Sequence, residues 1–186
     1  MKSICAGISI SIGCIAFLLS PIKIIGALLF CVGLLSIVVH RFTLFTGTIS
    51  SVTKSTIMDN IGILLYNILG VIILALIFVG TGISTDVNVI VASKLSADII
   101  EVFCKAILCN MLICLAVDEW KNTQNSLIVI LCVTVFVFCG FEHCIANTFY
   151  MLVANNFSIK FLIVNVLGNA FGGIMLWRLK HIREIS

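Results

Sequence analysis

A glutamate and a histidine stand side by side within an otherwise apolar part of this sequence. Glu142 and His143 follow a hydrophobic run over residues 127–138 and precede a short piece that reaches residue 155. An ionisable side chain inside such a run is costly and usually marks a functional site. Histidine suits proton chemistry because its reference pKa of about 6.5 lets modest changes in its surroundings alter its charge near neutrality. A neutral histidine that holds a helix break together is the structural alternative for His143, and we expect Glu142 to bind backbone amides or a neighbouring subunit.

Hydroxyl and amide side chains accompany both polar interruptions of the apolar pattern. Thr43, Thr46 and Thr48 lie in the first interruption, and Asn147 follows His143 in the second. Such side chains can bond to the backbone groups that become free where a membrane helix breaks. We therefore expect part of this polar set to be structural.

Two other chemistries use residues of the same stretches. His40 and His143 lie on different apolar runs and could ligate one haem iron in a membrane electron-transfer subunit. The nine cysteines form no Cys-x-x-Cys pair. Cys104, Cys109 and Cys114 lie five residues apart, which rotates them to different helix faces and disfavours a thiol–disulfide oxidoreductase. We interpret the cysteines as small apolar filler and expect no metal and no cofactor.

The composition places the whole chain in a membrane. Of 186 residues, 61% are hydrophobic and only 10% are charged, whereas soluble domains carry about 25% charged residues. The net charge of +3 is too small and too scattered to indicate nucleic-acid binding. A bilayer core about 30 Å thick needs close to 20 apolar residues per helix. Six such helices use most of the chain, so we expect one all-α transmembrane domain over residues 1–186.

Six apolar runs are separated by polar residues, and the second and fifth are interrupted. The second breaks at residues 40–48 before a weakly polar piece up to residue 58, and the fifth breaks at residues 140–143. The halves, about 1–80 and 97–186, hold three spans each, so the second must enter from the opposite side. Paired interrupted spans in two inverted repeats indicate a permeation or binding site. The expected spans are 4–19, 21–39, 61–79, 99–117, 127–138 and 157–177, with a polar loop over 80–96.

The Lys and Arg residues of the short loops predict the orientation. The side that holds the N-terminus carries six of them and the opposite side carries three. An excess of Lys and Arg marks the cytoplasmic side. We therefore expect an integral, multi-pass cell-membrane protein with both termini cytoplasmic. The six are Lys2, Lys54, Lys121, Arg178, Lys180 and Arg183, and the three are Lys23, Lys94 and Lys160.

Five short motifs resemble the formate–nitrite transporter family. The run over residues 138–147, Phe-Cys-Gly-Phe-Glu-His-Cys-Ile-Ala-Asn, strongly resembles the fifth-span signature of that family. The run over residues 44–47, Leu-Phe-Thr-Gly, is similar to its second-span motif, and Lys94, seven residues before Glu101, matches its lysine ahead of the fourth span. Residues 105–117 and 167–173 resemble its fourth-span and sixth-span stretches. The matches run in order over most of the chain.

The resemblance implies a six-helix fold like that of aquaporins and a homopentamer with one pore per subunit. It implies a channel or transporter, not an enzyme, for small monovalent anions of weak acids: formate, nitrite, hydrosulfide, and sometimes acetate or lactate. Thr46 and His143 would lie in a central chamber, with Lys94 near the outer vestibule and Asn169 on the sixth span. Two apolar constrictions would be formed by Phe30, Leu34, Leu44 and Phe136. Glu142 and Asn147 are assigned to the helix break.

These residues suggest a mechanism. Lys94 attracts the anion, the apolar constrictions exclude hydrated ions, and His143 donates or polarises a proton so that a neutral acid passes.

Three differences from the family pattern bear on activity: Thr43 replaces an acidic residue, Val164-Asn165-Val166 replaces Pro-Val-Thr, and the amphipathic lead-in to the first span is not present in this sequence. We expect these differences to alter substrate choice more than fold. An inactive, structural family member is the remaining alternative.

Overall fold

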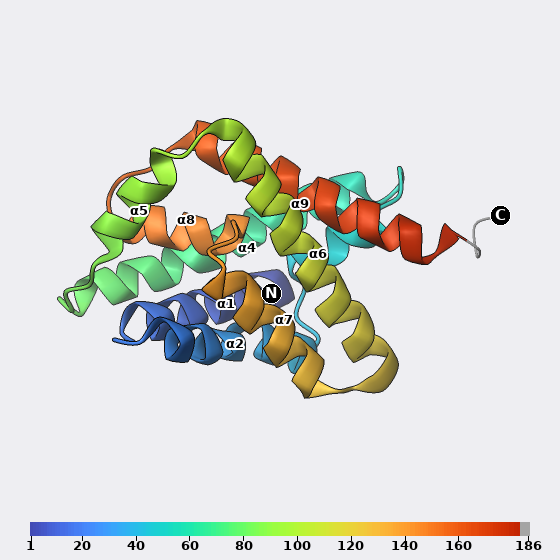
Figure 1. Cartoon of the computed structure of the whole chain (residues 1–186), viewed down its shortest axis with the longest axis horizontal. Coiled ribbons are helices and arrows are strands. Elements are labelled where there is room, and N and C mark those ends of the chain that lie inside the picture. Colours follow the sequence, from blue (N-terminus) through green and yellow to red (C-terminus); the bar gives the residue numbers. More distant parts are fainter. Residues whose placement is uncertain (183–186) are drawn as a thin grey trace.

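The computed structural model of this protein describes residues 1–182, and every regular element among them is helical (Figure 1). Two short helices, at residues 45–48 and 144–153, follow the predicted interruptions of the second and fifth spans. In chain order the elements are α1 (Lys2–Leu18), α2 (Lys23–His40), α3 (Phe45–Thr48), the 3-10 turn η1 (Ile49–Ser51), α4 (Ile57–Gly80), α5 (Val87–Leu95), α6 (Ile99–Thr123), α7 (Ser126–Phe138), α8 (Cys144–Val153) and α9 (Ile159–Lys180).

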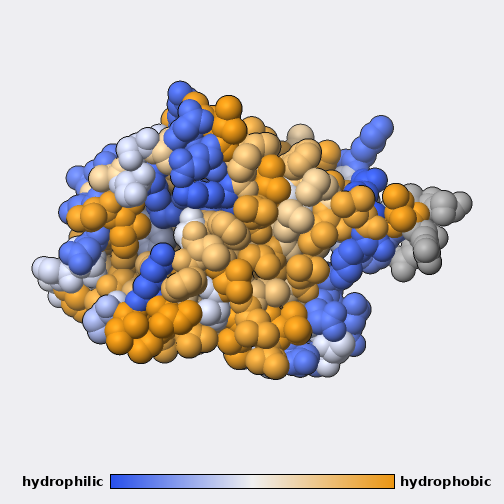
Figure 2. All heavy atoms as spheres, in the orientation of Figure 1, coloured by the Kyte–Doolittle hydropathy of each residue, from blue (hydrophilic) through white to orange (hydrophobic). Residues whose placement is uncertain are grey.

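Four of these helices, α2, α4, α6 and α9, are long and apolar enough to cross a membrane, and α1, α7 and α8 are shorter apolar helices. Their outward faces are hydrophobic: Leu65 and Leu76 on α4 are 61% and 70% exposed. Figure 2 shows hydrophobic side chains over the middle of one face, with hydrophilic ones toward the α5 end and toward the C-terminal end of α9. Such surfaces need lipid or another apolar partner, so this is an integral membrane protein.

The chain leaves the helix at both predicted interruptions, through the same kind of turn. After α2, the Phe42 amide donates to the Ile37 carbonyl at 2.9 Å, and Arg41 adopts a left-handed conformation with φ of 54°. After α7, the Phe141 amide donates to Phe136 at 2.9 Å, and Gly140 has φ of 71°. This turn satisfies the last carbonyls of a helix and favours glycine. Arg41 therefore costs about 1 kcal/mol that Gly140 does not.

Three predicted boundaries are wrong. The third span was expected to begin at residue 61, but α4 begins at Ile57. Residues 80–96 were expected to form a loop, but α5 occupies Val87–Leu95 because Val87 and Val91 are buried against the rest of the protein. The fourth span was expected to end at residue 117, but α6 continues to Thr123. Asp118 lies inside this last part of α6 and forms a salt bridge with Lys180 of α9. At α5 and at the end of α6, tertiary contacts outweigh a polar local sequence.

Glycines bring two pairs of helices into backbone contact. A Cβ atom at Gly7 of α1 would lie 2.0 Å from the Asn67 carbonyl oxygen of α4. A Cβ atom at Gly172 of α9 would lie 2.2 Å from the Ile107 carbonyl oxygen of α6. Small residues allow this close approach, which is how helices associate in lipid. The pairs α1–α4 and α6–α9 thus hold the two short helices, α3 and α8, between them.

Candidate functional site

Asn67 on α4 holds the break between α2 and α3. Its Oδ1 accepts from the Phe45 amide at 2.8 Å, and its Nδ2 donates to the carbonyls of Thr43 and Ser3 at 3.0 and 2.7 Å. The side chain is completely buried. The sequence interpretation did not single out Asn67, although an amide inside an apolar run was a usable signal.

Asn169 on α9 does the same for the break between α7 and α8. Its Oδ1 accepts from the Cys144 amide at 2.9 Å, and its Nδ2 donates to the carbonyls of Glu142 and Ala106, both at 2.8 Å. We call Asn67 and Asn169 the two clamp asparagines. Each clamp asparagine accepts from the first amide of a short helix, and it donates to the carbonyl two residues before that amide and to a carbonyl of the first helix of its half, α1 or α6. By this correspondence Thr43 occupies the place that Glu142 has in the second half.

His143 is the N-cap of α8 and is 2% exposed. Its Nδ1 accepts from the Ala146 amide at 3.2 Å, and its Nε2 lies 3.1 Å from the Thr46 Oγ1 of α3. Because Nδ1 is an acceptor, the proton of the neutral ring lies on Nε2, which donates to Thr46. A second proton on Nδ1 would remove the cap and place a positive charge at the positive end of α8. The arrangement therefore favours a neutral His143.

The His143 ring packs against one end of an aromatic pair, Phe136 and Phe30. The ring stacks on Phe136 with centroids 5.9 Å apart and an interplanar angle of 19°. Phe136 in turn meets the edge of Phe30 at 5.8 Å and 86°. Phe30 and Phe136 come from α2 and α7, so four elements meet at this point. The Thr46–His143 pair is a polar contact enclosed by hydrocarbon.

The Glu142 carboxylate binds two side chains and not the backbone amides that were one of its two expected partners, while contact with a neighbouring subunit stays a prediction. Its Oε2 accepts from Lys94 Nζ at 2.6 Å and from Asn147 Nδ2 at 2.7 Å. Glu142 is 3% exposed and Lys94 is 18% exposed. Burial explains the difference, since a buried charge is tolerated only when it is paired and hydrogen-bonded. The family resemblance places Lys94 near the outer vestibule. Its positive charge is neutralised by the Glu142 carboxylate, which belongs to another segment of the chain.

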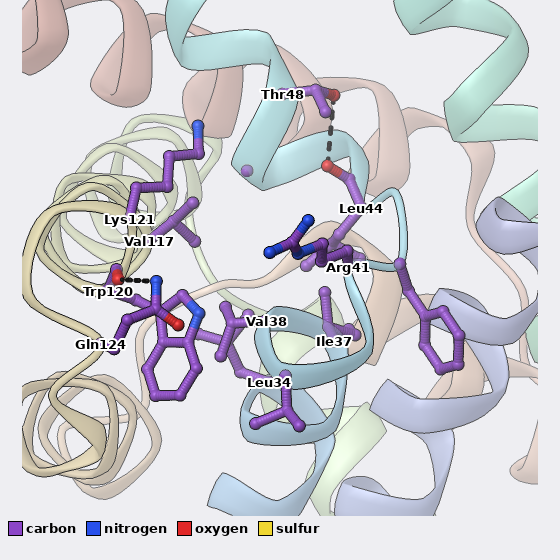
Figure 3. A pocket seen from close by; sticks show the side chains of 13 residues that line it. Leu34, Ile37, Val38, Arg41, Leu44, Thr48, Val117, Trp120, Lys121 and Gln124 are labelled. Atoms are coloured by element: carbon purple, nitrogen blue, oxygen red, sulfur yellow. Dashed lines mark hydrogen bonds between the residues drawn. The ribbon is translucent and has the colours of Figure 1, made fainter.

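Two cavities lie near the Thr46–His143 pair: His143 lines one of them, and the residues that flank Thr46 in the sequence, Leu44, Gly47 and Thr48, line the other. The first, which we call the His143 cavity, measures about 510 Å³ and is lined by residues that include Phe30, Lys94, Phe136, Glu142 and His143. The second, which we call the Arg41 cavity, measures about 480 Å³ (Figure 3). Its lining includes Leu34 and Leu44. The four predicted constriction residues therefore divide into two pairs, one pair at each cavity, and all four are buried.

The positions of the histidines and cysteines disfavour the two alternative chemistries, haem ligation and thiol–disulfide exchange. Both ring nitrogens of His143 are hydrogen-bonded, so neither is free to ligate an iron. His40 is exposed and packs near the Phe42 ring, with centroids 5.4 Å apart. All nine cysteines are free thiols. A haem site or a disulfide relay finds no assembled residues within 1–182.

A helical membrane protein with a buried polar contact near two cavities has the features of a channel or transporter. The family model for the formate/nitrite transporter matches residues 1–182, and the chain belongs to that family. The formate channel FocA of Haemophilus influenzae is 29% identical over 150 residues, covering 68% of this chain and 52% of that protein. A formate-nitrite transporter of Plasmodium malariae is 29% identical over 184 residues, covering 79% and 59%. The chain thus spans somewhat over half the length of these curated relatives.

One further relative and two solved structures also resemble this chain. The uncharacterized transporter YrhG of Bacillus subtilis is 31% identical over 179 residues, covering 81% of this chain and 67% of that protein. A solved pentameric formate channel with formate bound superposes with a TM-score of 0.84 at 23% identity, covering 100% of this chain and 96% of that one. An FNT family ion channel superposes with a TM-score of 0.85 at 22% identity, covering 98% and 88%. At these identities the superpositions establish the fold.

Proposed function

We propose that this protein is a transmembrane channel or transporter for small monovalent anions of weak acids, with formate, nitrite and hydrosulfide as substrates and protons as co-reactants. The observation that carries the proposal is the buried Thr46–His143 contact, which lies near two cavities and beside apolar side chains. The names of the relatives, formate channels and a formate-nitrite transporter, favour formate and nitrite among these substrates.

The apolar pairs act on hydration. A bare anion that loses its water between Phe30 and Phe136, or between Leu34 and Leu44, pays a Born cost of tens of kcal/mol. A neutral weak acid avoids most of this cost. Apolar constrictions of this kind also exclude hydrated ions by dewetting. A pore with such gates therefore passes an anion best when a proton joins it on the way.

The Thr46–His143 pair supplies hydrogen-bond donors at that point. His143 Nε2 donates to Thr46 Oγ1, so the hydroxyl hydrogen of Thr46 remains free to donate to an anion. An anion that takes this hydrogen bond is polarised by the imidazole behind it. Because Nδ1 already serves the helix cap, His143 polarises the anion and is not itself the acid, so the proton that neutralises the anion comes from the aqueous solution.

Lys94 attracts the anion more weakly than its single charge suggests. At about 4 Å and an effective dielectric constant near 20, one cation attracts an anion by about 4 kcal/mol. An anion on the far side of the ammonium, about 6 Å from the Glu142 charge, is repelled by about 3 kcal/mol on the same scale. The net attraction is then about 1 kcal/mol. We therefore assign Lys94 a modest share of the attraction.

The architecture that goes with this function is a single six-helix, aquaporin-like domain made of two inverted three-helix repeats. The breaks after α2 and α7, the glycine contacts of α1–α4 and α6–α9, and the two clamp asparagines support it because each feature occurs once per half. We propose a homopentamer, as in the pentameric formate channel of the same fold. We place both termini in the cytoplasm because the side that holds the N-terminus has the excess of Lys and Arg residues. Arg183, one of the residues counted, lies outside the described residues.

Anion flux into liposomes that contain the purified protein tests this proposal. We compare the parent with His143→Phe and Thr46→Val, which remove the donors, and with Lys160→Ala, an exposed lysine on α9, as the control. Loss of a hydrogen bond to a charged group, about 1.5–3 kcal/mol, slows flux about ten- to hundred-fold. Uptake of formate, nitrite and hydrosulfide is followed from pH 5 to 8.

Parental flux with the same pH dependence in both donor variants overturns the mechanism. A parent that carries none of the three anions, although it is folded and pentameric, overturns the function itself. That second outcome favours the inactive, structural member of the family.

A further inference from the structure

The two cavities differ in how their cations are paired. Of the three lysines that line the His143 cavity, Lys94 and Lys105 form salt bridges, with Glu142 at 2.6 Å and with Glu101 at 2.5 Å, and Lys23 lies over the Phe138 ring at 5.2 Å from its centroid. The Arg41 cavity contains two cations, Arg41 and Lys121, and no carboxylate among its lining residues. Neither cation forms a salt bridge within residues 1–182. Within the described part of the chain, the Arg41 cavity therefore carries two positive charges that have no salt-bridge partner.

The acidic residue beside Lys121 is already engaged. Asp118, one helical turn earlier on α6, forms a salt bridge with Lys180 of α9. Glu119, two residues before Lys121, points to another face of α6, and neither forms a salt bridge among residues 1–182. Asp118 and Lys180 instead join the ends of α6 and α9.

Arg41 stands at a backbone position that suits another residue. Its φ of 54° and ψ of 43° lie in the left-handed region, which favours glycine. In Figure 3 the Arg41 side chain extends across the opening toward α6, which contributes Val117, Trp120 and Lys121. A strained residue that persists and points into a cavity indicates a functional role.

We propose that Arg41 and Lys121 form an anion-binding site in the Arg41 cavity, which takes small carboxylates and inorganic anions of the same charge. The guanidinium fork of Arg41 matches the two oxygens of a carboxylate. The walls formed by Leu34, Leu44 and Val117 are apolar, so charges inside attract more strongly than in open water.

The size and place of the cavity decide what the site does. At about 30 Å³ per water molecule, the volume of about 480 Å³ holds an anion with its hydration shell. Leu34 and Leu44, two of the predicted constriction residues, line this cavity, and Leu44 lies two residues before Thr46. On the proposed function, this site collects the hydrated anion before dehydration at the two leucines. Binding itself does not depend on transport.

Trp120 provides a reporter for this site because it lines the cavity. The sequence has only two tryptophans, so a Trp177→Phe background leaves Trp120 as the single emitter. Quenching of Trp120 by iodide, an anion, is compared with quenching by caesium, a cation, at constant ionic strength in a neutral detergent. We expect iodide to quench several-fold better and formate to displace it.

Four variants assign the effect. Lys121→Gln and Arg41→Gly each reduce iodide quenching several-fold, and Arg41→Lys retains most of it. Lys160→Gln, which removes an exposed charge elsewhere, leaves quenching unchanged. Arg41→Gly also separates binding from folding, since glycine suits the left-handed position. Its melting temperature equals or exceeds that of the parent.

The quenching experiment can contradict the anion-binding site without contradicting the transport function, and the flux test can do the reverse. Iodide quenching that equals caesium quenching, or that formate does not displace, overturns the site. So does an Arg41→Gly protein that melts at a lower temperature and is still quenched normally, because Arg41 is then structural. Displaceable iodide binding in a protein without flux overturns the proposed function and leaves the site standing.

Discussion

The buried salt bridge between Lys94 and Glu142 leads to a prediction about what Lys94 does. Lys94→Met leaves the Glu142 carboxylate, 3% exposed, with Asn147 as its only side-chain donor among residues 1–182. Breaking a buried pair by removing one partner costs about 3–5 kcal/mol because the remaining charge is uncompensated. For a chain of this size each kcal/mol shifts the melting temperature by about 2–4 °C. We expect the Lys94→Met protein to melt roughly 6–20 °C lower.

A second ion pair of similar length provides the control. Lys105 Nζ lies 2.5 Å from Glu101 Oε1, but these side chains are 36% and 49% exposed. Exposed pairs contribute about 0–1 kcal/mol. Lys105→Met therefore changes the melting temperature by only a few degrees, although its pair is as short as that of Lys94. Thermal unfolding of the detergent-purified proteins, followed by tryptophan fluorescence, measures the difference.

The double variant Lys94→Met with Glu142→Gln distinguishes charge pairing from anion attraction. The amide oxygen of the introduced glutamine can still accept from Asn147, and no charge remains buried, so stability recovers to within about 2 kcal/mol of the parent. If flux also recovers, Lys94 serves mainly to neutralise Glu142. Equal melting temperatures for Lys94→Met and Lys105→Met, or a double variant as unstable as Lys94→Met alone, would refute the reasoning.

Two further predictions concern the helix contacts and the clamp asparagines. Gly7→Ala places a Cβ 2.0 Å from a backbone oxygen and should destabilise the protein by about 1–3 kcal/mol. Gly62→Ala, whose Cβ would have nothing within 4 Å, should be neutral or stabilise the protein by up to about 1 kcal/mol. Unfolding in mixed detergent micelles measures both free energies. An equal cost at the two glycines would contradict the close approach of α1 and α4. Asn67→Leu and Asn169→Leu each leave a buried backbone amide unpaired and cost about 1–3 kcal/mol, while exposed Asn122→Ala changes little. If either clamp variant were as stable as Asn122→Ala in the same assay, that clamp would have no structural role.

The sequence alone predicted the helices that depend on long apolar runs. The predicted span over residues 127–138 is α7, Ser126–Phe138, and the interruptions near residues 40 and 140 are present. It missed α5 because the residues that stabilise this helix, Val87 and Val91, are buried by segments distant in the sequence. A polar composition indicates a loop only when nothing else covers the segment.

Part of the candidate site was also visible in the sequence. His143 and Glu142 were recognisable because ionisable groups inside an apolar run are expensive, and the motif around them indicated the family. The Arg41 cavity was not recognisable. Arg41 and Lys121 are far apart in the chain, and each, taken alone, is an ordinary basic residue at the end of a helix.

The sequence by itself determined that the chain lies in a membrane, where its helices break and which titratable groups lie in the breaks. These properties depend on hydropathy and local backbone preference, which act over a few residues. Only the tertiary structure decided that Glu142 pairs with Lys94, 48 residues away, and that Thr46 meets His143, 97 residues away. Such partners are chosen by how helices pack, and packing is a property of the whole chain.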